Sequence, residues 1–147
     1  YIGRTFIMPN QKKRADAIGL KLNPVREIIQ GKSIILVDDS IVRGTTLRKI
    51  VAMSREAGAT EVHLRITCPP IKGPCFYGVD MSSYKELIAN KKKVDAIRKE
   101  LGADSLAYLS LEGLENAIGL PICTACLNGK YNSAYVEKIA KSAAEIE

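Results

Sequence analysis

The stretch that decides the fold is SIILVDDSIVRGTTLRKI, residues 33–50. It opens with a continuous apolar run that ends in two acids, a pattern typical of a parallel strand buried on both faces. A short polar loop follows, and Leu47, Ile50 and Val51 then fall on one face of a helix. The stretch therefore predicts a strand, a loop and a helix in direct succession.

The residues that follow extend this unit into an α/β domain. Gly58 can end the helix, and residues 61–66 alternate apolar and polar side chains as in a second strand. Because a helix connects the two strands, we expect them to run parallel. Further elements are predicted as helices at 82–89 (capped by Ser82 or Ser83), 92–102, 111–118 and 133–147, and as a third strand at 105–111. The fold class is α/β, with a parallel sheet flanked by helices.

Bulk composition narrows the class of protein. The 147 residues suffice for one domain, and the net charge of +6 suits an anionic partner. With no Trp and only two Phe, the chain is poorly supplied with aromatic side chains for stacking on nucleic-acid bases. No apolar run reaches membrane-spanning length and no signal peptide opens the chain, so we expect a cytoplasmic protein. Because residue 1 is Tyr rather than Met, we expect a piece of a longer protein.

The end of the first strand and the loop after it form the candidate binding site. In open α/β sheets, ligands lie beyond the carboxyl ends of the strands, where Asp38 and Asp39 stand. Residues 43–46 (Arg-Gly-Thr-Thr) offer donors for a phosphate at the start of a helix. The two acids would repel that phosphate, but carboxylates bind sugar hydroxyls and Mg²⁺ well. A ligand with a ribose, a phosphate and a metal-bound anionic group satisfies the whole stretch.

The segment ILVDDSIVRGTT closely resembles the phosphoribosyl pyrophosphate (PRPP) signature of type I phosphoribosyltransferases. YIGRTFI, KLNPVR, PPIKGPCFYGVDM and CTACLNGKY narrow the resemblance to the glutamine phosphoribosylpyrophosphate amidotransferases of de novo purine synthesis. The similarity covers nearly the whole chain, as the C-terminal part of that family's transferase domain. It implies an incomplete domain with a flexible loop and basic segment (1–30), a core (31–119), and a cysteine segment with a last helix (120–147).

The resemblance also implies roles for the residues of the signature. Asp38 and Asp39 would bind the ribose hydroxyls and the Mg²⁺ of PRPP. The loop that holds the 5-phosphate would consist of Ser40, Arg43, Gly44, Thr45 and Thr46.

The implied catalytic residues precede the signature. Arg4, in a loop of residues 1–7 that closes over the substrate, would face the pyrophosphate, and Lys21 would belong to the same closing region. The implied reaction is attack of ammonia on the ribose C1, with release of pyrophosphate and formation of 5-phosphoribosylamine. An N-terminal glutaminase domain, absent from this sequence, would supply the ammonia, and purine nucleotides would inhibit the enzyme.

Cysteines are the second set of candidate site residues. Cys123 and Cys126 form a Cys-x-x-Cys pair that can reach one metal centre, although two ordinary thiols are a fair alternative. The resemblance matches Cys75, Cys123 and Cys126 to ligands of a structural [4Fe–4S] cluster present in some family members, with another ligand upstream of this sequence. Zinc is the alternative metal. Cys68 we interpret as a buried strand thiol.

Two other classes of function remain open. A non-catalytic PRPP-binding regulatory module would need a DNA-binding helix pair, which we do not find. A purine-salvage phosphoribosyltransferase would not need the CFYGVDM and CTACLNGKY segments. The resemblance favours the amidotransferase, as a homo-oligomer with no nucleic-acid or membrane partner.

Overall fold

The structure is a computed structural model that describes residues 22–79 and 83–146. Arg4 and Lys21, the two predicted catalytic residues, lie outside the described residues. In chain order the elements are α2 (Arg26–Ile29), β1 (Ser33–Asp38), α3 (Thr45–Glu56), β2 (Glu61–Ile66), the 3₁₀ helix η2 (Tyr84–Glu86), α4 (Val94–Leu101), β3 (Ser105–Tyr108), α5 (Leu111–Ile118), α6 (Ala125–Asn128) and α7 (Ala134–Ile146).

Within the described residues, three parallel strands form the sheet in the order β1-β2-β3, which confirms the predicted class. Asp38 is in register with Ile66, and Ile66 with Tyr108, so the strands end on one line. Two backbone bonds continue the pairing, from Thr67 N–H to the Asp38 carbonyl (3.0 Å) and from Leu109 N–H to the Ile66 carbonyl (2.8 Å). We call this shared boundary the carboxyl edge.

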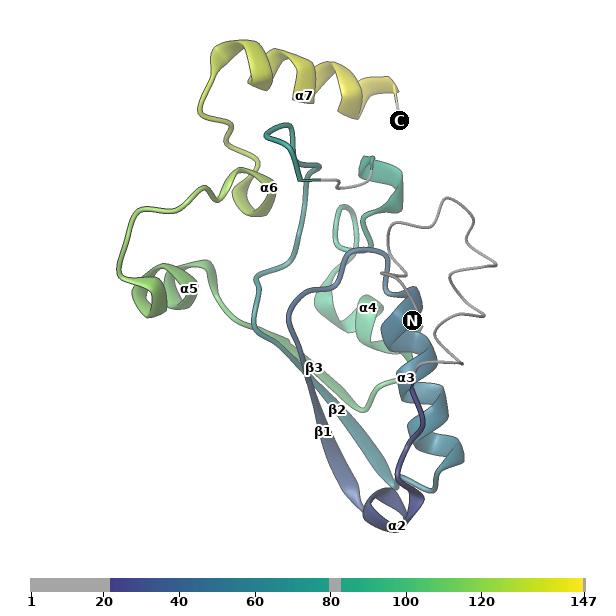
Figure 1. Cartoon of the computed structure of the whole chain (residues 1–147). Helices are drawn as coiled ribbons and strands as arrows, with labels where there is room; N and C mark the ends of the chain where they lie inside the picture. The colour runs from purple at the N-terminus through teal and green to yellow at the C-terminus, as the bar shows by residue number, and fades with distance from the viewer. Residues whose placement is uncertain (1–21, 80–82, 147) are drawn as a thin grey trace, which may run out of the picture.

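Helices α3 and α4 lie together on one side of the strands (Figure 1). Leu47 and Val51 of α3 are buried, which confirms the predicted helical face. They pack in one cluster with the buried side chains of β2 and α4, which are Val62, Leu64, Ile66, Ile97 and Leu101. Helices α5, α6 and α7 lie beyond the carboxyl edge.

The prediction that β1 is buried on both faces is wrong for this structure. Ile34 and Leu36 pack against the core, but Ile35 and Val37 on the opposite face are 62% and 69% exposed. An apolar run favours burial of both faces of a strand but does not establish it. Which face is covered depends on neighbours that the run itself does not contain.

The helix predicted for residues 82–89 is a single 3₁₀ turn, η2, and Ser83 at its N-cap makes no side-chain capping bond. The physical reason is the burial of three consecutive residues, Leu87, Ile88 and Ala89. A helix on a surface buries one stripe, so three adjacent buried residues require a more extended backbone. The other predicted helices and the third strand are present, and no helix within residues 22–79 or 83–146 is long and apolar enough to cross a membrane.

Candidate functional site

The two acids lie at the carboxyl edge, as predicted. The backbone N–H of Asp39 donates to Asp38 Oδ1 at 3.0 Å, and the Ser40 hydroxyl donates to Asp39 Oδ1 at 2.9 Å. Asp39 is exposed, whereas Asp38 is half-buried. Burial raises the pKa of Asp38, the charge of Asp39 adds to the rise, and the bond from the Asp39 N–H opposes it. The pair is a fixed acceptor site whose crowded negative charge a cation would relieve.

Gly44 makes the turn from the loop into α3. Its φ of +76° lies in the left-handed region that favours glycine. A Cβ at this position would come within 2.7 Å of Ile88 Cδ1 and 3.1 Å of Leu101 Cδ2. The backbone conformation therefore favours glycine here, and an added Cβ would displace the buried Ile88 side chain.

The start of α3 is suited to an anion. Its first two residues, Thr45 and Thr46, are exposed, and its first turn contains no acidic residue. The first N–H groups of any α-helix lack intrahelical acceptors and carry partial positive charge. The first helical bond of α3, from Arg48 N–H to the Gly44 carbonyl, spans 3.0 Å. A phosphate placed here could accept hydrogen bonds from the backbone and from two hydroxyls.

Arg43 has a partner that the sequence did not reveal. Its guanidinium binds Glu86 of η2 through two contacts, Nε to Oε1 at 3.0 Å and Nη2 to Oε2 at 3.1 Å. Both residues line a cavity of about 370 Å³ together with Tyr84, Asn90 and Lys91. The edge of the guanidinium that includes Nε is therefore directed at a carboxylate.

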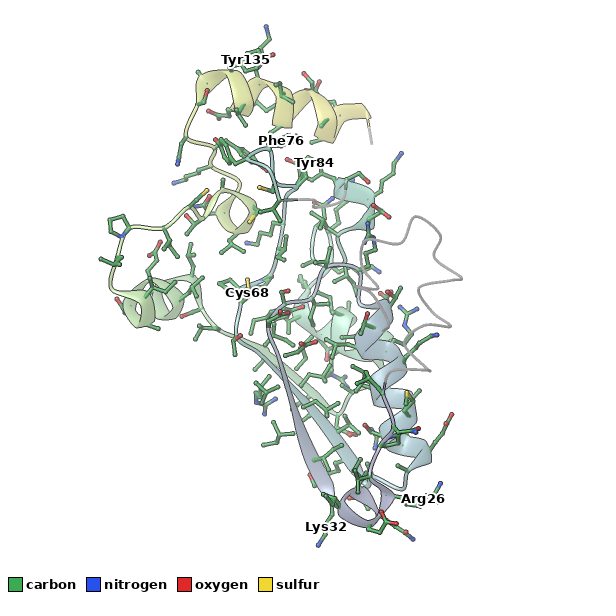
Figure 2. All side chains as sticks on the ribbon, viewed as in Figure 1. Arg26, Lys32, Cys68, Phe76, Tyr84 and Tyr135 are labelled. Atoms are coloured by element: carbon green, nitrogen blue, oxygen red, sulfur yellow. The ribbon has the colours of Figure 1, made fainter. Side chains whose placement is uncertain are left out.

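Three further side chains lie at the carboxyl edge: Thr67 and Tyr108, which sequence reasoning missed, and Cys68, which it expected to be buried within the strand but which is only half-buried. The Thr67 hydroxyl lies 3.5 Å from the carbonyl oxygens of both acids. Cys68 follows β2 rather than lying within it, and burial, together with the charge of Asp39, raises the pKa of its thiol. Figure 2 shows Cys68 just beyond the strand ends. Their position after a parallel strand was the signal that could have found them.

Tyr108, the last residue of β3, is the third. Its hydroxyl is buried and has no hydrogen-bond partner in the part of the chain that the structure describes. Burial raises its pKa to about 12, and the neighbouring Cys68 adds to the rise. A buried donor without an acceptor is energetically unfavourable.

The candidate metal ligands Cys75, Cys123 and Cys126 come from two segments that the structure joins. The N–H groups of Lys72 and Gly73 both donate to the Cys126 carbonyl, at 2.9 and 3.0 Å. Burial raises the pKa of Cys126, and the nearby Cys75, Cys68 and Cys123 thiols add to the rise. Counting only the described residues, no three His, Cys, Asp or Glu side chains are grouped so that they could hold a metal ion. The fold thus brings the cysteine segments together without assembling a three-ligand group.

A parallel sheet with a pair of acids at a strand end, followed by a turn into an exposed helix N-terminus, is the arrangement of a type I phosphoribosyltransferase domain. The chain spans about 30% of the length of the proteins it matches. It is homologous to a segment of the amidophosphoribosyltransferases.

The homology to amidophosphoribosyltransferases rests on curated relatives and on solved structures. The amidophosphoribosyltransferase of Methanocaldococcus jannaschii is 59% identical over 132 residues, which cover 89% of this chain and 28% of the relative. That of Synechococcus elongatus is 49% identical over 150 residues, covering 100% of this chain and 30% of the relative. No protein-family model matches the chain.

The fold also matches the glutamine PRPP amidotransferase of Bacillus subtilis complexed with ADP and GMP. The TM-score is 0.74 at 53% identity, over 90% of this chain and 30% of that protein. A second structure, described as the allosteric regulatory enzyme of purine biosynthesis, matches with a TM-score of 0.74 and 54% identity over the same shares.

Proposed function

We propose that this chain is the PRPP-binding part of an amidophosphoribosyltransferase, which forms 5-phosphoribosylamine and pyrophosphate from PRPP and ammonia. The observation that carries the proposal is the acid pair Asp38–Asp39 beside the N-terminus of α3, at one edge of a parallel sheet. Identity of 49–59% to proteins of that name supports it. Within the chain, residues 1–30 would form the closing loop and basic segment, 31–119 the core, and 120–147 the cysteine segment.

The parts of PRPP would be divided between the two halves of the site. Its 5-phosphate would accept hydrogen bonds from the first N–H groups of α3 and from the hydroxyls of Ser40, Thr45 and Thr46. The ribose hydroxyls would donate to the carboxylates of Asp38 and Asp39. A Mg²⁺ ion, which commonly takes one or two carboxylates together with substrate phosphate oxygens, fits the same pair and would neutralise charge on the pyrophosphate.

The reaction then depends on holding the sugar still. The ammonia lone pair forms the new bond to C1 as the bond from C1 to the pyrophosphate oxygen breaks; pyrophosphate leaves with the electron pair, and the new amine loses a proton. Positive charge grows on the sugar in the transition state, and fixed carboxylates nearby favour it. In this proposal Arg4 and Lys21 contact the leaving pyrophosphate and help to exclude water.

The rest of the activity would involve other parts of the protein. Ammonia would come from a glutaminase domain, and a homo-oligomer in the cytoplasm would be the working form. The structural neighbour was solved with ADP and GMP, which supports the binding of purine nucleotides, and in this proposal they act as inhibitors.

The proposal is tested with the protein expressed from the complete gene that contains this sequence. Asp39→Ala should weaken Mg²⁺-dependent PRPP binding by more than about a hundredfold, because it removes a charged acceptor from ribose and metal. Asp95→Ala, which removes an exposed acid of α4, is the matched control and should bind PRPP as the wild type does. Unchanged affinity of Asp39→Ala in calorimetry would contradict the assignment.

An assay of pyrophosphate release separates this function from the alternatives. Glutamine or ammonia should act as the acceptor of the phosphoribosyl group. Release that requires a free purine base would indicate a salvage enzyme. PRPP binding without turnover, with every acceptor, would indicate a regulatory module.

A separate proposal concerns Cys75, Cys123 and Cys126, which we infer to be ligands of a structural [4Fe–4S] cluster. The bonds from Lys72 and Gly73 to the Cys126 carbonyl support it, because they tie the two cysteine segments together. The three sulfurs would have to draw closer than they lie here. Anaerobically purified protein should contain iron and sulfide and be coloured; iron-free, colourless protein would contradict the proposal, and bound zinc would favour the alternative metal.

Variants sharpen that experiment. Cys123→Ser should lose iron, since it removes a proposed ligand. Cys68→Ser should retain it, because the family resemblance does not match Cys68 to a ligand position. Cys68 packs in the same cluster as Cys126, so loss of iron in this variant would show that Cys68 supplies a ligand.

A further inference from the structure

Residues 84–90 contact the loop between β1 and α3 in three ways. The first contact is the pair of bonds between Arg43 and Glu86. The side chains of Arg43 and Glu86 are 25% and 37% exposed, so the ion pair is partly shielded from water. Bidentate Arg–carboxylate pairs combine charge with a fixed planar geometry, which a single lysine contact does not provide.

The second contact is between backbones. The N–H of Ile88 donates to the Val42 carbonyl at 2.9 Å, immediately before the turn at Gly44. The segment that makes this bond is itself firmly held, because Ile88 and Ala89 belong to the main core cluster. The Asn90 side chain donates to the Tyr84 carbonyl at 3.1 Å and closes the segment on itself.

The third contact is steric. The Ile88 side chain fills the space beside Gly44, where a Cβ would lie only 2.7 Å from its Cδ1. The backbone of the turn thus rests directly on a buried side chain of the segment. Together the contacts hold residues 42–44 by a charge pair, a backbone bond and van der Waals packing.

We propose that Glu86 and Ile88 are positioning residues for the phosphate loop, and that Arg43 acts by anchoring the loop to Glu86 rather than by binding the phosphate. This role rests on the proposed function. The N–H groups at the start of α3 are fixed in direction by the turn that precedes them. A turn held from 84–90 presents those groups to the 5-phosphate without reorganisation on binding.

The two possible roles of Arg43 predict opposite effects of changing Glu86. If Glu86 holds the anchor in place, Glu86→Gln should raise the Kd for PRPP with Mg²⁺ about tenfold, since a charge-assisted bidentate pair is lost. If Arg43 binds the phosphate itself, the same variant should bind PRPP as well as the wild type or more tightly, because a competing carboxylate is gone. Glu112→Gln, on the exposed surface of α5, is the matched control and should leave Kd unchanged.

A double-mutant cycle gives a second readout. Arg43→Ala and Glu86→Ala should each weaken PRPP binding to a similar extent, and the double variant should bind no worse than either. Additive losses would show that Arg43 acts independently of Glu86 and would overturn the positioning role. Thermal unfolding of every variant identifies any that fails to fold.

Hydrogen exchange tests the anchor without a ligand. Glu86→Gln should speed exchange of the Ile88 N–H bonded to Val42, while the amides of β2 keep their protection. Unchanged exchange at Ile88 together with unchanged Kd would overturn this inference alone. A wild-type protein that binds no PRPP would overturn the proposed function and this role with it.

Discussion

The carboxyl edge and the cysteine region (residues 71–76 and 123–131) are held in place by different means. At the carboxyl edge the register of three strands and a core cluster that spans the sheet, α3 and α4 fix the backbone. In the cysteine region the backbone is fixed by two small hydrophobic clusters, around Leu127 and around Tyr131, and by hydrogen bonds between loops. A site on strand ends inherits the rigidity of the sheet, whereas a site on loops depends on a few contacts.

The largest expected difference comes from core truncation. Leu64 is fully buried in the centre of the sheet, and Leu64→Ala should lower the free energy of unfolding by about 2–5 kcal/mol. Leu127 belongs to the smaller cluster and is 8% exposed, so Leu127→Ala should lower it by only about 1–3 kcal/mol. Urea denaturation measures both, and equal losses would show that the two regions are equally well packed.

A glycine pair isolates packing from backbone strain, because Gly44 and Gly129 share a φ of +76°. Gly129→Ala meets no atom of the described residues within 4 Å and should lower the free energy of unfolding by about 1 kcal/mol. Gly44→Ala also meets Ile88 and should lower it by about 2–4 kcal/mol. Similar values for the two variants would mean that the turn at Gly44 is not packed against residue 88.

For two tyrosines the larger loss of stability is expected in the cysteine region rather than at the carboxyl edge. The buried Tyr131 hydroxyl donates to the Pro74 carbonyl at 2.8 Å, so Tyr131→Phe should lower the free energy of unfolding by about 1–2 kcal/mol. Tyr108→Phe removes a hydroxyl that has no partner among the described residues, and should leave stability unchanged or raise it by up to about 1 kcal/mol. A clear loss in Tyr108→Phe would reveal an acceptor for that hydroxyl.

The smallest effect concerns Asp38 and pH. Because its pKa is raised in the folded state, the ionised carboxylate opposes folding at neutral pH, and this opposition is absent below the ordinary pKa of 3.8. Asp38→Asn should therefore stabilise the fold at pH 7 by at most about 1 kcal/mol, since the group is only half-buried. The gain should shrink as pH falls through the folded pKa of Asp38 toward that ordinary value.

Asp95 is the control of opposite sign. Bonds from Arg98 and Lys99 lower its pKa, so the ionised form favours folding at neutral pH. Asp95→Asn should reduce stability at pH 7, and this loss should vanish as pH falls below the folded pKa. Unfolding curves between pH 3 and 7 measure the stability of both variants. Stability changes of the same sign in the two variants would contradict the opposite pKa shifts of Asp38 and Asp95.

The sequence predicted the site best where the site residues are neighbours along the chain. Asp38, Asp39 and the loop after them were placed correctly at the end of a strand and before a helix, because an apolar run and a helical period are local signals. The 3₁₀ turn at Tyr84–Glu86 was missed, since the burial of the residues after it depends on the core they enter. Thr67 and Tyr108 were missed because only strand pairing brings Thr67 beside Asp38 and places Tyr108 at the same edge of the sheet.

By itself, the sequence determined the succession of strand, loop and helix, the acids at the strand end and the glycine at the turn, because each follows from residue type and spacing along a short stretch. Tertiary structure alone decided which face of β1 is covered and which partner Arg43 has, a carboxylate 43 residues away. Burial and ion pairing are properties of neighbours in space, and a chain acquires those neighbours only when it folds.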